Sequence, residues 1–327
     1  MSGTRVITII CWIVSALVLI GLLIWLLTSA IFSGWGFFRD INIFGINIAG
    51  IESLTGPFDV REIRTESTTG LNSITVNWVA GDVTVKSYDG DEIKISESAQ
   101  RELRNNEQMH ISSNNRILRI DFRERSNFRG RMPRKNLEVL IPHTFAVNMT
   151  DLSINSTSGS IYAEQITAGN VDISTVSASI RAVDITANSI RMGTTSGAIS
   201  GSTIKAQILE AYSVSGALNI TYSEAPTVDL GTTSGAIVLS GVYDRIKTST
   251  VSGRIYIESS IVPGSIDSST VSGSTEVHMP NTGEITVSHS AVSGRFSSEI
   301  PVIMQSNAAY SFSSVSGSTN IYVIEVE

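Results

Sequence analysis

Residues 190–216 read IRMGTTSGAISGSTIKAQILEAYSVSG and contain one short motif twice, as Thr195-Ser196-Gly197 and Val214-Ser215-Gly216. Nine copies of this motif occur between residues 157 and 317, at spacings of 18 to 23 residues. The last position of the successive copies is occupied by Gly159, Ala178, Gly197, Gly216, Gly235, Gly253, Gly273, Gly294 and Gly317. A nearly constant period of about 20 residues is typical of repeat proteins, in which one unit is too short to bury its own core.

Apolar residues recur at fixed distances from each motif. The position seven residues before the glycine is apolar in all nine copies, as Leu152, Val171, Ile190, Leu209, Val228, Ile246, Ile266, Val287 and Tyr310. The position two residues after it is apolar in seven of nine copies. Stacked units with this pattern bury a continuous core, so each unit is expected to form one coil of two or three short strands.

The motif itself is expected to form a corner of each coil. Glycine there supplies either a positive φ or room for close approach of the next coil. The stacked serines are expected to form a ladder of hydroxyl groups that bond to neighbouring coils.

The sequence therefore predicts an all-β protein whose residues 152–327 form a parallel, right-handed β-helix or solenoid of about nine coils. At about 4.8 Å per coil the rod would be about 43 Å long. The last apolar run, residues 321–324, is expected to close its C-terminal end. A β-sandwich is the alternative, but a sandwich gives no reason for nine corners to stay in phase.

The N-terminal region is expected to anchor the chain in a membrane. Residues 6–32 contain no charged residue, and about 20 apolar residues suffice to span a bilayer as a helix. A cleaved signal peptide, the alternative, has an apolar region of only about 7–15 residues. Arg5 precedes the span and Arg39, beside Asp40, follows it, which favours an inside N-terminus and an extracytoplasmic C-terminal domain. We therefore predict an anchor at residues 1–32, in contact with membrane lipid through residues 6–32.

Two further segments lie between the anchor and the repeats. Residues 33–57 are apolar and rich in glycine, and are expected to be a membrane-proximal connector whose Trp35, Phe37 and Phe38 suit the lipid interface. Residues 58–151 contain alternating apolar patterns and a hairpin signal at Asp89-Gly90. They are expected to form an irregular β cap that protects the open end of the solenoid.

The cap contains a basic stretch. Residues 116–135 carry a net charge of +6, whereas the rest of the chain carries −13. Its basic residues are Arg116, Arg119, Arg123, Arg125, Arg129, Arg131, Arg134 and Lys135. One hypothesis is an anion-binding loop that faces phospholipid headgroups or an anionic surface polymer. The simpler alternative is a solvated hairpin whose charges discourage edge pairing.

The sequence offers little chemistry beyond this stretch. The four histidines show no metal-ligand spacing, and no phosphate-binding loop, dinucleotide fingerprint or nucleophile elbow occurs. Asp172, Asp229 and Asp267 share one outward position of the repeat, but cationic or intervening coils separate them. We therefore expect no catalytic residue, metal or cofactor, and a net charge of −7 argues against a nucleic-acid partner.

Several segments together resemble a known family. Residues 79–85 (VAGDVTV), Asp89-Gly90-Asp91, residues 137–142 (LEVLIP) and the serial Ser-Gly corners are similar to those of a bacterial adhesin-like family of domains of unknown function. The resemblance covers about residues 58–327. It implies a β-solenoid at the cell envelope, often joined to a membrane segment, and brings no established catalytic residues.

The expected function is non-catalytic adhesion, scaffolding or sensing at the bacterial cell envelope. The partner would be an envelope polysaccharide, an anionic polymer or another protein. Self-association of rods into a structural filament is a second hypothesis, because a solenoid end can be exposed. A carbohydrate-active β-helix enzyme is a third, which would need convergent carboxylates on one face.

Overall fold

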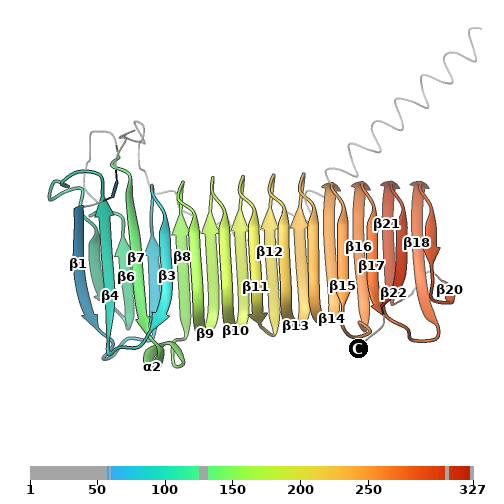
Figure 1. Cartoon of the computed structure of the whole chain (residues 1–327), viewed down its shortest axis with the longest axis horizontal. Coiled ribbons are helices and arrows are strands. Elements are labelled where there is room, and N and C mark those ends of the chain that lie inside the picture. The colour runs from blue at the N-terminus through green and yellow to red at the C-terminus, as the bar shows by residue number, and fades with distance from the viewer. Residues whose placement is uncertain (1–56, 59, 125–131, 306–308, 325–327) are drawn as a thin grey trace, which may run out of the picture. The chain divides into compact units, whose positions relative to one another are not determined.

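The computed structural model describes residues 57–58, 60–124, 132–305 and 309–324, and these form an all-β solenoid of about nine turns with an irregular N-terminal β region (Figure 1). The predicted anchor at residues 1–32, and all of the connector except residue 57, lie outside the described residues. In the described part of the chain, no helix has the length and apolar character needed to cross a bilayer.

Each coil of the solenoid contains two strand segments, one before and one after the Ser-Gly corner. The middle strands are β8 (Asp151–Ser156), β9 (Ile161–Thr175), β10 (Ile180–Thr194), β11 (Ile199–Lys205), β12 (Ile208–Ser213), β13 (Leu218–Thr232), β14 (Ile237–Ser252) and β15 (Ile255–Ser259). Neighbouring coils pair in parallel with a shift of one repeat, so that Ile161 lies opposite Ile180 and Ile180 lies opposite Ile199. The parallel stacking expected from the period is confirmed, while its right-handed winding stays a prediction.

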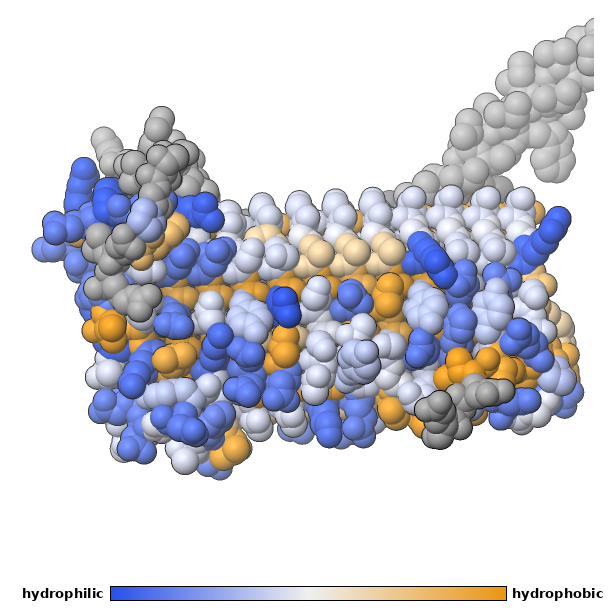
Figure 2. Space-filling model, viewed as in Figure 1, coloured by the Kyte–Doolittle hydropathy of each residue, from blue (hydrophilic) through white to orange (hydrophobic). Residues whose placement is uncertain are grey.

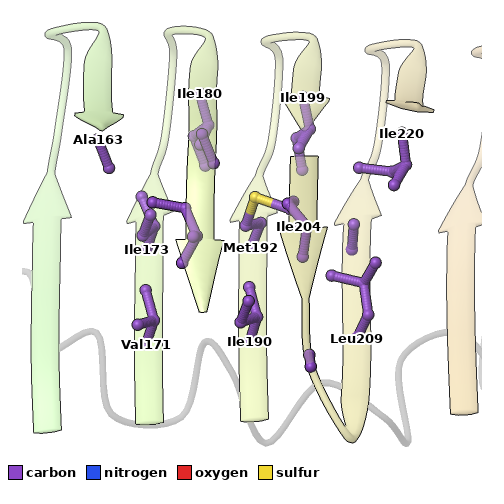
Figure 3. Packing of buried hydrophobic residues seen from close by; sticks show 14 of the residues in the cluster. Ala163, Val171, Ile173, Ile180, Ile190, Met192, Ile199, Ile204, Leu209 and Ile220 are labelled. Carbon is purple, nitrogen blue, oxygen red and sulfur yellow. The ribbon is translucent and has the colours of Figure 1, made fainter. Parts of the chain in front are cut away.

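The core of the rod consists of the apolar positions that the repeat predicted. Val171, Ile190 and Leu209 precede the corners on one wall, and Ile180 and Ile199 follow the corners on the other. Figure 3 shows these side chains pointing between the two walls. Because every coil adds such residues, the rod contains one continuous hydrophobic cluster.

In five consecutive coils the second bend has a backbone feature that the sequence did not indicate. Gln165, Asp184, Thr203 and Tyr222 have φ values between 51° and 55°, and Gly241 follows them with a φ of 152°. They recur every 19 residues. Positive φ is therefore required at this bend and not at the Ser-Gly corner, and four of the five residues adopt it without being glycine.

The N-terminal strands do not stack in chain order. They are β1 (Val60–Ser67), β2 (Ser73–Asn77), β3 (Val83–Tyr88), β4 (Glu92–Ala99), β5 (His110–Asn114), β6 (Ile117–Asp121) and β7 (Lys135–Pro142), followed by the single turn α2 (His143–Ala146). The β2/β3 coil lies between the later β6/β7 coil and the β8/β9 coil. Antiparallel strands β4 and β1 extend one wall and β5 extends the other, which makes this end irregular.

The C-terminal end contains a second exchange of order. Its strands are β16 (Ser265–Ser272), β17 (Thr275–Pro280), β18 (Ile285–Ser293), β19 (Phe296–Ser298), β20 (Val302–Met304), β21 (Tyr310–Ser316) and β22 (Thr319–Ile324). The β21/β22 coil inserts between the β16/β17 coil and the β18/β19 coil. The expectation that residues 321–324 close the rod is therefore wrong, because this run pairs with β17, Ile321 also pairs with β19, and β18, β19 and β20 lie beyond it.

Candidate functional site

The Ser-Gly corners owe their glycines to close approach between coils. A Cβ atom on Gly216 would lie 1.6 Å from the carbonyl oxygen of Gly197, and one on Gly197 would lie 1.8 Å from that of Ala178. At every corner glycine an added Cβ atom would lie 2.0 Å or less from a carbonyl oxygen of the adjacent coil. These glycines are Gly159, Gly197, Gly216, Gly235, Gly253, Gly273, Gly294 and Gly317. None of these corner glycines is among the described glycines that have a positive φ. These corners build the rod and present no reactive group.

A buried hydroxyl three residues before each corner joins adjacent coils. Ser213 Oγ donates a hydrogen bond to the carbonyl of Gly197 at 3.0 Å and accepts one from the amide of Gly216 at 2.8 Å. Thr194 and Thr232 make the same two contacts. The predicted ladder holds at the first corner, where Ser158 Oγ donates a hydrogen bond to the carbonyl of Val79 on the neighbouring coil at 2.9 Å. The other corner serines are exposed, and the buried hydroxyls bond adjacent coils in their place.

Along the corner edge the outward side chains are small and weakly polar. Figure 2 shows them as regular pale rows along the upper edge, where strands such as β16 and β18 end in Figure 1. Such an edge is smooth and uncharged over most of its length.

The basic stretch separates into different environments. Arg116 lies in the turn between β5 and β6 with a φ of 67°, and Arg119 is half-buried on β6. Arg123 Nη1 donates to the carbonyl of Glu124 at 3.0 Å, and the exposed Arg134 lies 5.8 Å from the centre of the Phe58 ring. Arg125, Arg129 and Arg131 lie outside the described residues. Anion binding by this group stays a prediction.

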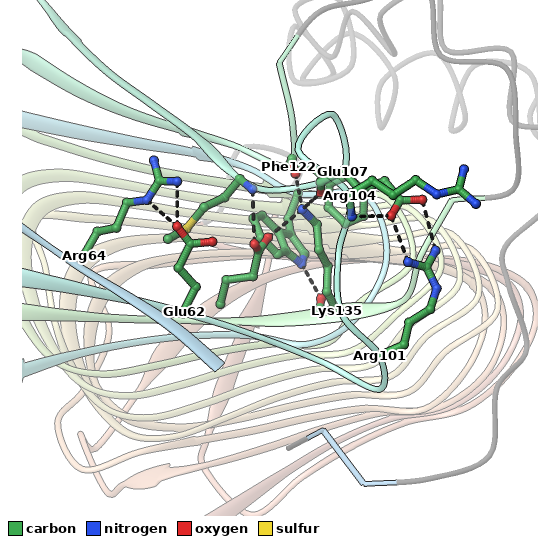
Figure 4. A network of polar contacts seen from close by, with 10 residues as sticks. Glu62, Arg64, Arg101, Arg104, Glu107, Phe122 and Lys135 are labelled. Carbon is green, nitrogen blue, oxygen red and sulfur yellow. Dashed lines mark hydrogen bonds and ion pairs between the residues drawn. The ribbon is translucent and has the colours of Figure 1, made fainter. Parts of the chain in front are cut away.

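Lys135 does not belong to an exposed basic loop, and its assignment there is wrong. Its side chain is fully buried between the walls of the cap, where Nζ lies 2.5 Å from Glu97 Oε1 (Figure 4). Nζ also donates to the carbonyls of Glu107 and Phe122. The ammonium lies 4.2 Å from the Phe122 ring centre and 5.1 Å from that of Trp78, so it is enclosed on all these sides.

The electrostatics of this pair follow from burial. Burial lowers the pKa of Lys135 to about 8, although Glu97 opposes that shift. Burial likewise raises the pKa of Glu97, against the pull of Lys135. A buried ammonium of lowered pKa can act as a base or nucleophile, but this one already contacts a carboxylate, two carbonyls and two rings. We conclude that it holds the cap together.

A second polar cluster stabilises the loop beside it. Glu107 accepts two hydrogen bonds from Arg101, at 2.8 and 3.0 Å, and one from the amide of Arg104 at 2.9 Å. The contact with Arg101 holds the pKa of Glu107 below its usual range. Sequence reasoning missed both acids. Glu97 meets Lys135 only through the antiparallel pairing of β4 with β7, whereas Glu107 is held within its own loop by Arg101 and Arg104.

Outward charges on the rod pair with one another across coils. Arg191 lies 2.7 Å from Glu210 on the next coil, and Lys247 lies 3.1 Å from Asp229. Asp172 differs, since burial raises its pKa to about 6 while Arg191 opposes the shift. Within the described residues, no three histidine, cysteine, aspartate or glutamate side chains are grouped to hold a metal ion.

Three aromatic rings stack along the opposite wall. Tyr256 on β15 lies 4.9 Å from His278 on β17, and His278 lies 4.8 Å from Tyr322 on β22. Tyr322 reaches this stack only because β22 inserts beside β17. Ring contacts of this kind stabilise adjacent coils.

Comparison with protein families gives a match along most of this architecture. The family model described as Toastrack DUF4097 matches residues 71–325, which include the β2/β3 coil and every Ser-Gly corner. No curated protein matches the chain.

Solved structures resemble the chain only distantly. A candidate adhesin from Bacteroides fragilis NCTC 9343 is 13% identical over 81% of this chain and 98% of its own, with a TM-score of 0.41. A candidate lipid-binding protein from Parabacteroides distasonis ATCC 8503 is 17% identical over 80% of this chain and 96% of its own, with a TM-score of 0.44.

Proposed function

Since the chain belongs to the Toastrack DUF4097 family, we propose that it is a single-pass membrane protein that displays a non-catalytic β-solenoid outside the cytoplasmic membrane. The rod would serve adhesion, scaffolding or sensing at the bacterial cell envelope. The anchor rests on the 27 uncharged residues 6–32, which exceed the length a helix needs to span a bilayer.

The non-catalytic role is supported by the ion pairs that outward charged side chains form between adjacent coils. Arg191 with Glu210, and Lys247 with Asp229, neutralise each other between adjacent coils. Hydrolysis of a glycoside requires two carboxylates placed about 5–10 Å apart around one bond. The paired charges instead favour a rigid rod that exposes a long, regular surface to a partner.

A binding screen tests this proposal. The full-length protein in nanodiscs would be applied to immobilised envelope polysaccharides, anionic polymers and envelope proteins. The proposal expects retention of at least one class without chemical change of the ligand. Turnover of a polysaccharide into shorter fragments would contradict it and would favour an enzyme.

The basic residues of the cap provide a narrower hypothesis within this function. Arg116 and Arg134 are exposed at the irregular end of the rod, and could contact anionic headgroups or an anionic polymer. Liposomes with and without anionic lipid would be compared for wild type and for R116A/R134A. Equal binding by both proteins would rule the arginines out.

Self-association is a second candidate, and the C-terminal end favours it. Within the described residues, β20 pairs with Ile285, Thr286 and Val287 of β18, and Val292, further along β18, is 84% exposed. An unpaired strand edge with an exposed apolar side chain can accept another strand. Sedimentation would show concentration-dependent oligomers, which Val292→Lys would abolish; monomers at all concentrations would exclude the filament.

A further inference from the structure

The last coil at the C-terminal end of the rod has strand edges that are open on one side. Within the described residues, β19 pairs with β22 on one side, and β18 pairs with β21 on one side and with the short β20 on the other (Figure 1). Strand β20 covers β18 at residues 285–287, so the outer side of residues 288–292 is open. None of β18, β19 and β20 contains Asp, Glu, Lys or Arg. An uncharged open edge of this kind can accept another strand.

The core is also incompletely covered at this end. His289 and Phe296 come from the two walls of the last coil, and their ring centres lie 5.3 Å apart. Both side chains are half-buried, whereas their partners on the adjacent coil, Phe312 and Thr319, are only 2% and 3% exposed. A further layer of strands would therefore bury apolar surface here.

The other end of the rod does not suit this role. Among the described strands, β1 is outermost on one wall of the cap, and it carries Glu62, Arg64 and Glu66. Charges along an edge strand discourage pairing with another chain. Contact between the two unlike ends would also continue into an open filament, whereas contact between two equal ends closes as a dimer.

We propose that two copies of this chain bind each other through their C-terminal ends, with the β19 strands paired antiparallel about a two-fold axis at Ser297. Such a dimer gives the self-association candidate, on which it rests, a definite partner and register. It is independent of the side of the membrane on which the rod is displayed.

The backbone of β19 has the correct orientation for this pairing. The carbonyl of Arg295 and the amide of Glu299 both bond to β22. Alternation along the strand therefore directs the amide and carbonyl groups of Phe296 and Ser298 to the open side. With Ser297 on the axis, Phe296 lies opposite Ser298 of the second copy, and these two residues can exchange both of their backbone hydrogen bonds.

The same register places opposite charges together. Arg295 and Glu299 are exposed and lie two residues before and two residues after Ser297, so their side chains leave the strand on the same face. In the antiparallel pair each Arg295 lies opposite Glu299 of the second copy, which gives two ion pairs. Glu299 already accepts the amide of Val323 through Oε2 at 2.9 Å, and this contact holds its side chain beside the edge.

The other wall fits the same axis. The midpoint of the open residues 288–292 is Ser290, which lies four residues before the corner, while Ser297 lies three residues after it. These distances from the corner are nearly equal, so one two-fold axis can pass through both serines. Antiparallel pairing about Ser290 sets five open residues against five, and places Val292, which is 84% exposed, opposite Ser288 of the second copy.

Disulfide trapping of the full-length chain in detergent tests the register. Cys11→Ser removes the single native thiol, and Ser297→Cys places a thiol on the axis. Opposite Cα atoms at such a non-hydrogen-bonded position lie about 4.5 Å apart, a distance that a disulfide spans. Mild oxidation is therefore expected to link most of the dimer that sedimentation detects. Asn320→Cys, which lies opposite Ser297 on the adjacent coil, is the matched control and should stay unlinked, because its two copies would be about 14 Å apart.

Two results of this experiment would overturn the proposal. One is sedimentation that shows monomers at all concentrations. The other is a dimer in which Ser297→Cys is linked no more than Asn320→Cys, which would require a different surface for self-association. Neither result bears on adhesion or on display of the rod, which the binding screen and the labelling of intact cells measure separately.

Exchange of the two charges provides a second measurement. Arg295→Glu should weaken dimerisation on the order of tenfold, because it sets like charges opposite each other at two places, and Glu299→Arg should do the same. The double variant Arg295→Glu/Glu299→Arg restores both ion pairs in reverse order and should recover most of the affinity. A double variant as weak as the single ones would contradict the register.

Discussion

At the scale of single residues, burial determines the behaviour of the charged groups in this protein. Lys135 and Glu97 are removed from water together, and their ion pair is supported by two carbonyls and the amide of Met109. Removal of one partner from such a pair leaves an unpaired charge in the interior, which costs more than the pair contributes. The cap is therefore sensitive to single substitutions and tolerant of a matched double substitution.

Glu97→Gln is expected to destabilise the protein by about 3–5 kcal/mol, because it leaves the ammonium of Lys135 without a counter-charge. Urea denaturation followed by tryptophan fluorescence would measure the loss, since Trp78 packs against Lys135. The double variant Glu97→Leu/Lys135→Met should recover most of it. A double variant as unstable as the single one would contradict this interpretation.

Replacement of Asp172 by asparagine is expected to stabilise the protein in a pH-dependent way. Its folded pKa, about 6, lies above the usual value of 3.8, so the folded state binds the proton more tightly than the unfolded state. The stability that this group contributes is complete below pH 3.8 and is lost as the pH rises through 6. Asp172→Asn should therefore stabilise the protein at pH 7.5, on the order of 1 kcal/mol after screening at a half-buried site.

The same variant should show no gain near pH 3.5, where both proteins carry a neutral side chain. Thermal melts at the two pH values, with Asp267→Asn as an exposed control in the same column, provide the measurement. A gain that is equal at both pH values would show that burial of the charge is not its cause.

At the scale of the coil, the corner and the buried hydroxyl act as one unit. The hydroxyl of Thr175 lies 3.4 Å from the carbonyl of Gly159, longer than the equivalent 2.9–3.2 Å distances in the next coils. The corner of that same coil carries Ala178 in place of glycine. One methyl group is therefore accommodated at this corner, where the distance from the hydroxyl to the carbonyl is longer.

Gly216→Ala should cost about 2 kcal/mol, because its Cβ would overlap the carbonyl of Gly197 and the coils must separate to relieve it. The reverse change at the natural alanine, Ala178→Gly, should remain within about 0.5 kcal/mol of wild type, since the restored contact offsets the flexibility of glycine. Chemical denaturation of both variants checks this pair. Equal losses would mean that close approach does not select glycine.

The repeat was enough to predict the coils, because the inward positions before and after each corner keep one phase in the sequence. The cap pair was not predictable in the same way. Lys135 stands among seven arginines in the sequence, and only the antiparallel pairing of β4 with β7 brings it to Glu97. The buried hydroxyls were overlooked because the outward serine beside the glycine is the more regular signal.

At the scale of the whole molecule, the order of coils differs from the order of the chain at both ends. The β2/β3 coil and the β21/β22 coil each insert between two others. Equivalent corners carry no information on their order, so the sequence alone could not show these exchanges. In both exchanges, strands that are distant in the chain pair with one another. An end coil therefore cannot open without also breaking pairs made by another segment, which limits fraying at both ends of the rod.

The display of the rod outside the cytoplasmic membrane is the central claim, and cysteine labelling tests it most directly. Tyr222→Cys, in a chain whose Cys11 is changed to serine, places one thiol at a position that is 81% exposed. A membrane-impermeant maleimide should label this variant in protoplasts or spheroplasts to the same extent as after lysis. Tyr243→Cys, in the core, should stay unlabelled in both. Labelling of the Tyr222→Cys thiol only after lysis would place the rod in the cytoplasm and contradict the proposed function.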